Sequence, residues 1–476
     1  MVSPRHDRPA SAIGPGSRRQ NSVLALSLSL TARGLRAAGR LLAFALAARL
    51  FRLGEVGDFA FWLAAGSLTA VLSDLGLSEH LTRALPGAVG NNGIVRAALR
   101  ARLAALLPCL VFGWLIGVAF GGIGDLGAVG SFAFGVAVGF SDFLSAIRRA
   151  TGRFDLEILE SGLVTGVGLG TGLAAVASGL GFVPFQLALG AGAVGAAAVR
   201  VVALARTVRS SGDGAGPGAG GVAAEARWLW ARAILGWGYL DATVLLVGLV
   251  SDPVQVALFA GAARLVGIMT QPLLAVAAVF TPVLAHEASF GRERFEAASR
   301  RLNWIGLASV PCAFAACIVL GHFGIAGFGA GFRSAQPILA LLALGFAVHA
   351  GVLSSVPLIV LGRERSLVLS TIGGQSVLWI TTLALAGRRG AEGGAIGVLT
   401  CLIAVKVATV VLYQRARLPL GGWLQCAAIA AVLAWFLAVW NLDGWPRWSL
   451  LGGGAVMSGL ATLVLLTRTK VVTHAA

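Results

Sequence analysis

Long apolar runs fill this chain almost from end to end, and short polar segments separate them. Fourteen runs reach about 20 residues or more, the length at which an α-helix crosses a hydrocarbon core about 30 Å thick. The expected spans are residues 33–53, 57–80, 98–120, 126–147, 156–179, 183–206, 228–250, 256–284, 303–326, 335–361, 366–387, 391–413, 423–441 and 447–467. The pattern predicts an all-α polytopic membrane protein.

Arginines lie in alternate gaps between these runs. The basic gaps hold Arg5, Arg8, Arg18 and Arg19; Arg96, Arg100 and Arg102; Arg148, Arg149 and Arg153; Arg206, Arg209 and Arg227; Arg292, Arg294, Arg300 and Arg301; Arg363 and Arg365; Arg415 and Arg417; and Arg468 and Lys470. Short basic loops are translocated poorly, so these gaps are predicted to be cytoplasmic. Both termini then lie in the cytoplasm, as an even number of spans requires. Arg388 and Arg389, which fall in an outer gap, are the exception.

The composition agrees with a membrane protein, because 57% of the residues are hydrophobic and only 12% are charged. Such a chain has too little polar surface for a soluble globule. The net charge of +17 is spread over the loops of one side, so a nucleic-acid partner is not expected, and anionic inner-leaflet lipids account for the charge. The five cysteines lie in apolar segments without CxxC spacing, and neither a metal site nor any cofactor is expected.

One glycine-rich polar segment divides the chain. Residues 208–227 include a stretch with the composition of a flexible linker. The expected parts are a cytoplasmic tail at 1–32, a six-span lobe at 33–207, the linker at 208–227, a second six-span lobe at 228–413, and a terminal helix pair with its tail at 414–476. Gly57-Asp58-Phe59 and Ala257-Leu258-Phe259 follow corresponding outer turns, which indicates a duplication. Duplicated membrane transporters commonly bind substrate between their repeats.

Four segments resemble a known family. They are RLFRLGEVGDFAFWLAAGSLTAVLSDLGLSEHLTRALP at 49–86, YLDATVLLVGLVSDPVQVALFAGAARL at 239–265, FGAGFRSAQPILALLALGF at 328–346, and GAEGGAIGVLTCLIA at 390–404. In order and spacing they resemble the polysaccharide-transporter flippases of the multidrug, oligosaccharidyl-lipid and polysaccharide exporter superfamily.

The resemblance implies a V-shaped pair of six-helix bundles around a central cavity. It implies transport of a polyprenyl-diphosphate-linked oligosaccharide from the inner to the outer leaflet of a bacterial cytoplasmic (inner) membrane, for lipopolysaccharide or exopolysaccharide synthesis. The implied partners are that lipid-linked oligosaccharide, membrane lipids and other polysaccharide-assembly membrane proteins.

Charged residues inside the expected first spans are candidates for holding the diphosphate, since each costs roughly 2.5 to 3.5 kcal/mol on insertion. Arg33, Arg36 and Arg40 lie on one helical face that points inward from the cytoplasmic end. The alternative is that these long side chains reach back to lipid phosphates. Asp74 has the same expected depth as Arg36, so these two residues are also candidates for an ion pair with each other.

A second group of candidates lies in the second lobe. Asp241 and Arg264 are each eleven to twelve residues from the turn at Asp252-Pro253, which places both near the bilayer midplane and predicts an ion pair. The pair either locks two spans statically or opens when substrate phosphate competes for Arg264. His349 falls in the middle of span 335–361 and is a candidate proton carrier, with a structural hydrogen bond as the alternative.

Three acidic residues near cytoplasmic span ends are expected to pair with neighbouring arginines. They are Asp142, Glu157 and Glu160, with Arg148, Arg149 and Arg153 as the expected partners. A membrane glycosyltransferase or ligase is a weaker alternative for the chain, because the outer gaps are too short to display a catalytic loop. Within transport, a multidrug or ion antiporter and a lipid II flippase stay open; an antiporter would favour a more acidic buried site in the first lobe.

Overall fold

A computed structural model describes residues 15–84, 92–121, 126–150, 154–210, 219–237, 239–269, 284–285, 287–349 and 355–418. Every regular element in these ranges is a helix, as the sequence predicts. Seven of the described helices are long and apolar enough to cross a membrane. The expected spans 423–441 and 447–467 lie outside the described residues, so the terminal pair stays a prediction.

The first half of the fold begins with a helix longer than the expected span. Its elements are α1 (Pro15–Leu50), α2 (Leu53–Asp74), α3 (Leu77–Ala84), α4 (Asn92–Gly121), α5 (Leu126–Ala150), α6 (Phe154–Ala177) and α7 (Phe182–Ser210). Helix α5 lies in the middle of this half, packed against α2, α6 and α7. The predicted span 57–80 is divided, because Leu75 and Gly76 take positive φ angles of 52° and 73° that end α2 and start α3.

The second half contains several short helices beside three long ones. Its elements are α8 (Ala219–Trp237), α9 (Asp241–Val250), α10 (Pro253–Met269), α12 (Arg292–Phe328), the 3-10 helix η1 (Ala330–Ala335), α13 (Gln336–His349), α14 (Val356–Val360), α15 (Glu364–Arg389) and α16 (Ala391–Arg415). The predicted span 228–250 is therefore two helices, α8 and α9, with the break just before Asp241. Helices α15 and α16 form a hairpin that packs on α13.

We refer to the two faces of the bundle by their loops. The basic end carries the helix ends near Arg96, Arg206 and Arg415, and the opposite end carries the turns at Gly54 and Pro253.

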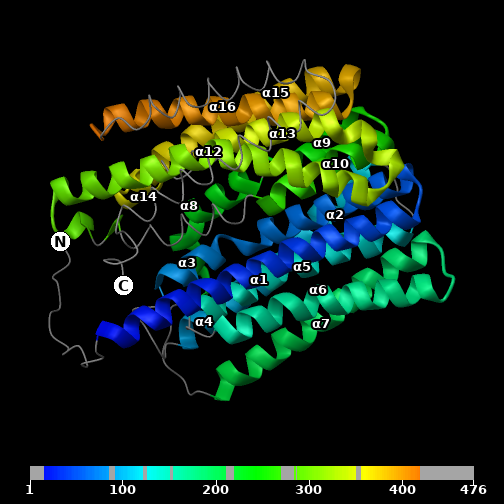
Figure 1. Cartoon of the computed structure of the whole chain (residues 1–476). Coiled ribbons are helices and arrows are strands. Elements are labelled where there is room, and N and C mark those ends of the chain that lie inside the picture. The colour runs from blue at the N-terminus through cyan, green and yellow to red at the C-terminus, as the bar shows by residue number, and fades with distance from the viewer. Residues whose placement is uncertain are drawn as a thin grey trace.

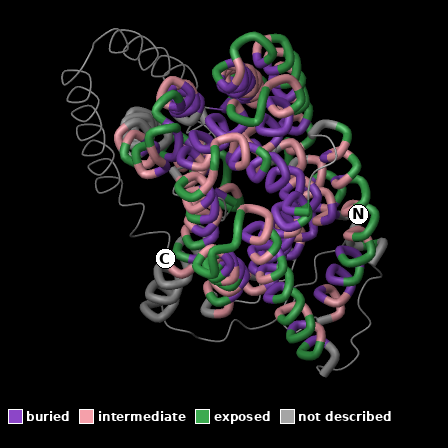
Figure 2. Tube along the Cα trace, turned by 90° about the vertical axis from the view of Figure 1, so that its right-hand side faces the viewer, coloured by how far each residue is buried: buried purple, intermediate pink, exposed green. Residues whose placement is uncertain are grey.

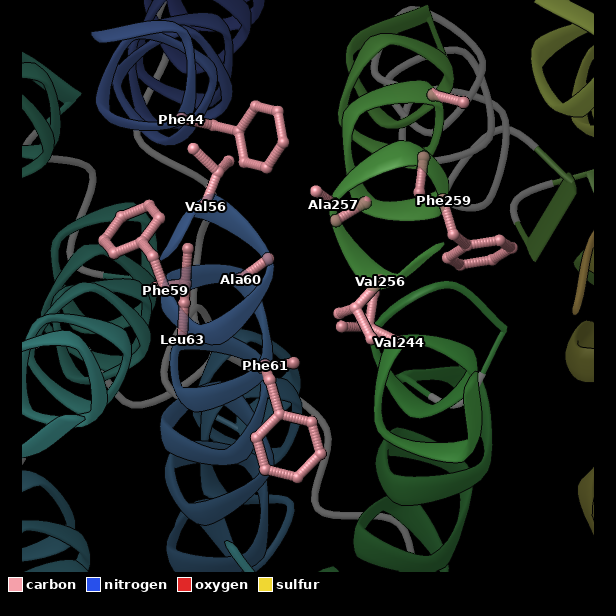
Figure 3. Packing of buried hydrophobic residues seen from close by; sticks show 14 of the residues in the cluster. Phe44, Val56, Phe59, Ala60, Phe61, Leu63, Val244, Val256, Ala257 and Phe259 are labelled. Atoms are coloured by element: carbon pink, nitrogen blue, oxygen red, sulfur yellow. The ribbon is translucent and has the colours of Figure 1, made fainter. Parts of the chain in front are cut away.

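At the opposite end the two halves meet through α2. A Cβ atom on Gly57 would collide with the carbonyl of Pro253 at the start of α10, so this position requires glycine. Further along the same helix, the ring of Phe61 packs against Gly248 of α9. Figure 3 shows this apolar interface, with Ala60 and Phe61 of α2 on one side and Val256 and Ala257 of α10 on the other.

The contact of α2 with the second half continues to the basic end. The indole Nε1 of Trp230 in α8 donates a hydrogen bond to the carbonyl of Leu72 at 3.1 Å. The corner at Gly76 touches the backbone of Ala226 and Trp230, which leaves no space for a side chain. Helix α2 and its corner therefore form a seam with α8, α9 and α10 that runs from one face of the bundle to the other.

Helix α1 contacts the second half differently. The ring of Phe44 packs edge-on against Phe328 and Phe332, with centroids 5.3 and 5.8 Å apart. Nearer the opposite end, Arg49 Nε donates to the carbonyl of Gly327. From Phe44 toward the basic end, α1 and α12 diverge, as the left of Figure 1 shows. The halves are thus joined along the seam and, beside α1, near the opposite end.

The outward faces are apolar, as lipid contact requires. Leu107 of α4 and Ile380 of α15 are each 69% exposed, although both are large and hydrophobic. Figure 2 shows the buried residues gathered in the middle of the bundle and the exposed ones around its outside.

Candidate functional site

Arg36 of α1 is buried and held by several groups of its own half. Its guanidinium donates to the hydroxyls of Ser145 and Ser161 at 2.7 and 2.6 Å, and its Nε lies 2.8 Å from a carboxylate oxygen of Asp142. Glu157, at 3.9 Å, completes the set. Lipid phosphates are therefore not needed to explain how this charge is accommodated, because α5 and α6 supply its partners.

Arg40, one helical turn further along α1, has a weaker attachment. Its Nη2 lies 3.6 Å from the second carboxylate oxygen of Asp142, and its Nε is buried without a hydrogen-bond partner among the described residues. The side chain of Asp142 is 48% exposed. A carboxylate this exposed within a candidate membrane span is unstable against lipid, so we expect Asp142 and the neighbouring Arg40 to face a polar, water-accessible space.

The predicted pairing of Arg36 with Asp74 is wrong. Asp74, at the end of α2, pairs with Arg102 of α4 and also accepts from the hydroxyl of Ser78 at 2.6 Å. Matching depth alone did not decide the partner, since Asp74 and Arg36 lie on helices whose charged faces point to different neighbours.

Arg102 is the most enclosed arginine among the described residues, with a side chain only 1% exposed. It donates to the carbonyls of Ala70 and Gly139, each at 3.3 Å, and its guanidinium lies 4.7 Å from the ring centroids of both Phe140 and Phe143. We interpret Arg102 as a brace between α2, α4 and α5. Its place near the end of an apolar run predicts a cytoplasmic loop arginine, and this role as a brace was not predicted.

The expected acidic pairs form in part. Glu160 binds Arg148 at 2.9 Å and Arg200 of α7 at 2.8 Å, while Glu157 binds Arg149 at 3.3 Å. Asp142 instead binds the two arginines of α1. The first-half cluster is the set Arg36, Arg40, Asp142, Arg148, Arg149, Glu157, Glu160 and Arg200, in which arginines outnumber carboxylates.

The predicted pair in the second half is present. Arg264 of α10 and Asp241 of α9 are 3.0 Å apart, with side chains 11% and 13% exposed. Arg264 Nε and Nη2 are buried and have no hydrogen-bond partner among the described residues. Asp241 is the first residue of α9, directly after the helix break. Broken helices of this kind supply the binding sites of several transporter folds.

Arg40 and Arg264 lie at the same level on facing helices. Phe44 packs on α10 at Gly261, where an added Cβ would lie 3.2 Å from its ring. Arg40 is about 6 Å from Phe44 toward the basic end, and Arg264 about 4.5 Å from Gly261 in the same direction, at about 1.5 Å of rise per residue. Each arginine shares a helical face with the residue that makes the contact. The two halves therefore each place one arginine just inside their contact.

His349 is the last residue of α13, and its side chain lies outside the described residues, so its role stays a prediction. Among the residues that the structure describes, no group of three His, Cys, Asp or Glu side chains is placed to hold a metal ion.

The fold is similar to that of known proteins, although the sequence is not. No protein-family model and no curated protein matches the sequence. Among solved structures, the chain is similar to an inward-facing multidrug resistance MATE family transporter of the MOP superfamily, with a TM-score of 0.55 and 15% identity over 83% of this chain and 94% of that one. The chain has the fold of the MATE transporters.

Two further structures agree. A eukaryotic MATE transporter gives a TM-score of 0.55 at 14% identity, covering 87% of this chain and 99% of that one. A MOP superfamily transporter from Pyrococcus furiosus gives 0.56 at 16% identity, covering 84% and 96%, and its description reads that reverse polarity of the binding pocket suggests a different function. These neighbours are transporters and not enzymes. At such identities they establish the all-helical transporter architecture and not the substrate.

Proposed function

We propose that this protein is a membrane exporter that works by alternating access and moves a polyprenyl-diphosphate-linked oligosaccharide across the membrane. The observation that carries the proposal is the pair of arginines, Arg40 and Arg264, set at one level on facing helices of the two halves. Each is held by one aspartate and keeps at least one buried nitrogen without a partner among the described residues.

A diphosphate suits this arrangement chemically. Guanidinium groups bind phosphate oxygens in paired, charge-assisted hydrogen bonds, which are about twice as strong as neutral ones. A buried N–H without a partner is costly, and an incoming oxyanion would satisfy Nε and Nη2 of Arg264 together. Because the arginines come from different halves, a bound diphosphate would bring both halves into contact with one ligand and so bias their relative position.

The arrangement of the halves suits a substrate with a lipid tail. The seam of α2 with α8, α9 and α10 closes one side of the bundle along its length, whereas α1 and α12 diverge toward the basic end. A polar head could lie between the halves while the polyprenyl chain stays in the bilayer on the side of α1.

A cation-exporting antiporter fits the described charges less well. It would need an acidic buried site in the first half, and there Glu157 and Glu160, both essentially unexposed, are each bound to arginines. The first-half cluster has a positive balance, which favours an anionic substrate. A lipid II flippase would also bind a diphosphate, so the arginines do not separate it from an oligosaccharide flippase.

The test uses the purified protein in vesicles that contain a fluorescent polyprenyl-diphosphate-linked sugar. Head-group movement is followed with a membrane-impermeant quencher. Wild type should move the probe between leaflets, and Arg264→Ala should move it at least about tenfold more slowly. Arg292→Ala is the matched control, because Arg292 is 66% exposed and pairs with Glu296 on the surface of α12. No movement by wild type, together with export of a cationic dye, would reject the proposal and favour the antiporter. Stronger inhibition of probe movement by lipid II than by other lipid-linked sugars would identify a lipid II flippase, and the opposite order would identify an oligosaccharide flippase.

Orientation in the cytoplasmic membrane is tested separately. We expect the basic end to face the cytoplasm, with both termini on that side. Alkaline phosphatase fused after Gly390, in the hairpin at the opposite end, should be active, and the same enzyme fused after Arg415 should be inactive. The reverse pattern would invert the direction of transport that we propose.

A further inference from the structure

We infer that Asp142 is a built-in competitor of the substrate: its carboxylate occupies the arginines of α1 when the site is empty, and returns to them to expel the diphosphate. This inference rests on the proposed function, because it assigns a role within the same site.

Asp142 binds the two arginines of α1 through separate carboxylate oxygens, whereas Glu160 binds Arg148 and Arg200 through one and the same oxygen. One oxygen of Asp142 lies 2.8 Å from Arg36 and the other 3.6 Å from Arg40, so one carboxylate spans two guanidinium groups. Two cationic groups converging on two oxygens is the arrangement that a phosphate group would also satisfy. Asp142 therefore holds the arginines in a geometry that fits an oxyanion.

The exposure of the Asp142 side chain indicates that another anion can displace its carboxylate from the arginines. The side chain of Asp142 is 48% exposed, whereas those of Glu157 and Glu160 are 0% and 1% exposed. An incoming anion could reach Arg40 through the polar space that Asp142 faces. The two glutamates are enclosed among arginines of α5 and α7, where no such exchange is open to them.

The fold does not depend on the charge of Asp142. Arg36 keeps Ser145, Ser161 and Glu157 as partners when the aspartate is neutral. The loss falls on Arg40, whose Nε already has no partner among the described residues. Removing the charge at Asp142 should thus free a cation for the substrate and leave the packing of α1 on α5 and α6 in place.

The consequence for transport is a separation of binding from turnover. A competing carboxylate weakens substrate binding, yet it also supplies a charge that takes the arginine back when the substrate leaves. Without it, the site should bind more tightly and release more slowly.

The experiment measures binding and transport of the fluorescent polyprenyl-diphosphate-linked sugar by the full-length protein, in nanodiscs and in vesicles respectively. Asp142→Asn should lower Kd about fivefold, the scale of a half-exposed ion pair, and should lower both KM and kcat. Asp142→Glu should behave as wild type, because it restores the carboxylate. The control is Asp252→Asn, at an exposed turn of the opposite end where Asp252 accepts from the backbone N–H of Gln255.

Combined substitution identifies the arginine involved. Adding Arg40→Ala to Asp142→Asn should remove the gain in affinity, since the freed cation is gone. Unchanged or weaker binding by Asp142→Asn, with normal binding by wild type, would overturn the inference and leave the proposed function intact. Failure of Asp142→Asn to fold, with Asp142→Glu folded, would identify a structural counter-ion and would also overturn it. Absence of binding by wild type would instead reject the proposed function.

Discussion

Arg102 and Arg264 both lie within helices of the bundle and both pair with an aspartate, but their surroundings differ. Arg102 has Asp74, two backbone carbonyls and two aromatic rings around it. Arg264 has Asp241 and two buried nitrogens without a partner among the described residues. An ion pair by itself therefore does not distinguish a brace from a binding site. The distinction lies in how much hydrogen-bonding capacity the pair leaves unused.

The two arginines also differ in how much the protein would be destabilised if the arginine were removed. A buried charge that loses its partner is strongly destabilising, because neither water nor another group replaces the lost interaction. Arg102 joins three helices through its contacts, whereas Arg264 joins α9 to α10 near the helix break. We expect the stability of the protein to depend mainly on Arg102 and its transport activity mainly on Arg264.

The largest expected effect is on stability at the brace. Arg102→Ala should lower the free energy of unfolding by about 3 kcal/mol, because it removes the contacts that join three helices and leaves the partly buried carboxylate of Asp74 with only the hydrogen bonds of Ser78. Thermal unfolding of the detergent-solubilised protein measures this. Adding Asp74→Ala should recover part of the loss. A single variant as stable as wild type would show that Arg102 is not a brace.

The second largest effect is expected on transport, when the Asp241–Arg264 pair is changed. Arg264→Ala should lower the transport rate about tenfold or more, since charge-assisted hydrogen bonds contribute about 1.5–3 kcal/mol. The exchanged pair Asp241→Arg with Arg264→Asp restores opposite charges and should recover stability without recovering transport. Recovery of both in the vesicle assay would identify Asp241–Arg264 as a static lock.

A third effect concerns the seam. Gly57→Val should weaken the contact between α2 and α10 at the opposite end by about 1–3 kcal/mol, because the new side chain would overlap the carbonyl of Pro253. The measurement is the labelling rate of a cysteine placed at Asp252, which should rise. Gly54→Ala is the control, since nothing lies within 4 Å of an added Cβ there. Equal labelling in the two variants would argue against a tight contact.

The smallest effect is expected on the surface. Arg292→Ala removes an exposed pair with Glu296 and an exposed hydrogen bond to the carbonyl of Arg417, and should change stability by less than about 1 kcal/mol, without affecting transport. A marked transport defect would mean that the start of α12 takes part in substrate handling, and the contrast between Arg102 and Arg264 would then be incomplete.

Particular residues show what the sequence could and could not predict. The Asp241–Arg264 pair was predictable, because both residues are counted from one tight turn and lie on adjacent antiparallel helices. The pairs Glu157–Arg149 and Glu160–Arg148 were also predictable from proximity, whereas Arg200 of α7, the second partner of Glu160, was not. Arg36 was paired with the wrong aspartate, since depth fixes only one coordinate and the direction of each side chain around its helix depends on packing.

The two helix breaks were missed because apolar runs hide them. Residues 57–80 and 228–250 are continuous in hydropathy, but the chain turns at Gly76, and α8 ends at Trp237, just after Gly236. A glycine within an apolar run is a weak signal, since many glycines here lie inside intact helices. Arg102 was missed because it lies near a span end, where arginines usually face lipid phosphates, and only the surrounding phenylalanines indicate burial.

The seam along α2 has a consequence for inhibition. If one side of the bundle is closed along its length, a blocking molecule with a lipid tail cannot enter there and would arrive, like the proposed substrate, from the bilayer beside α1. Its potency would then follow its concentration in the lipid phase, so the apparent inhibition constant should rise as more lipid is added at fixed protein. A compound designed against Arg40 and Arg264 would need an anionic head to meet the arginines and enough hydrophobicity to reach them through the membrane.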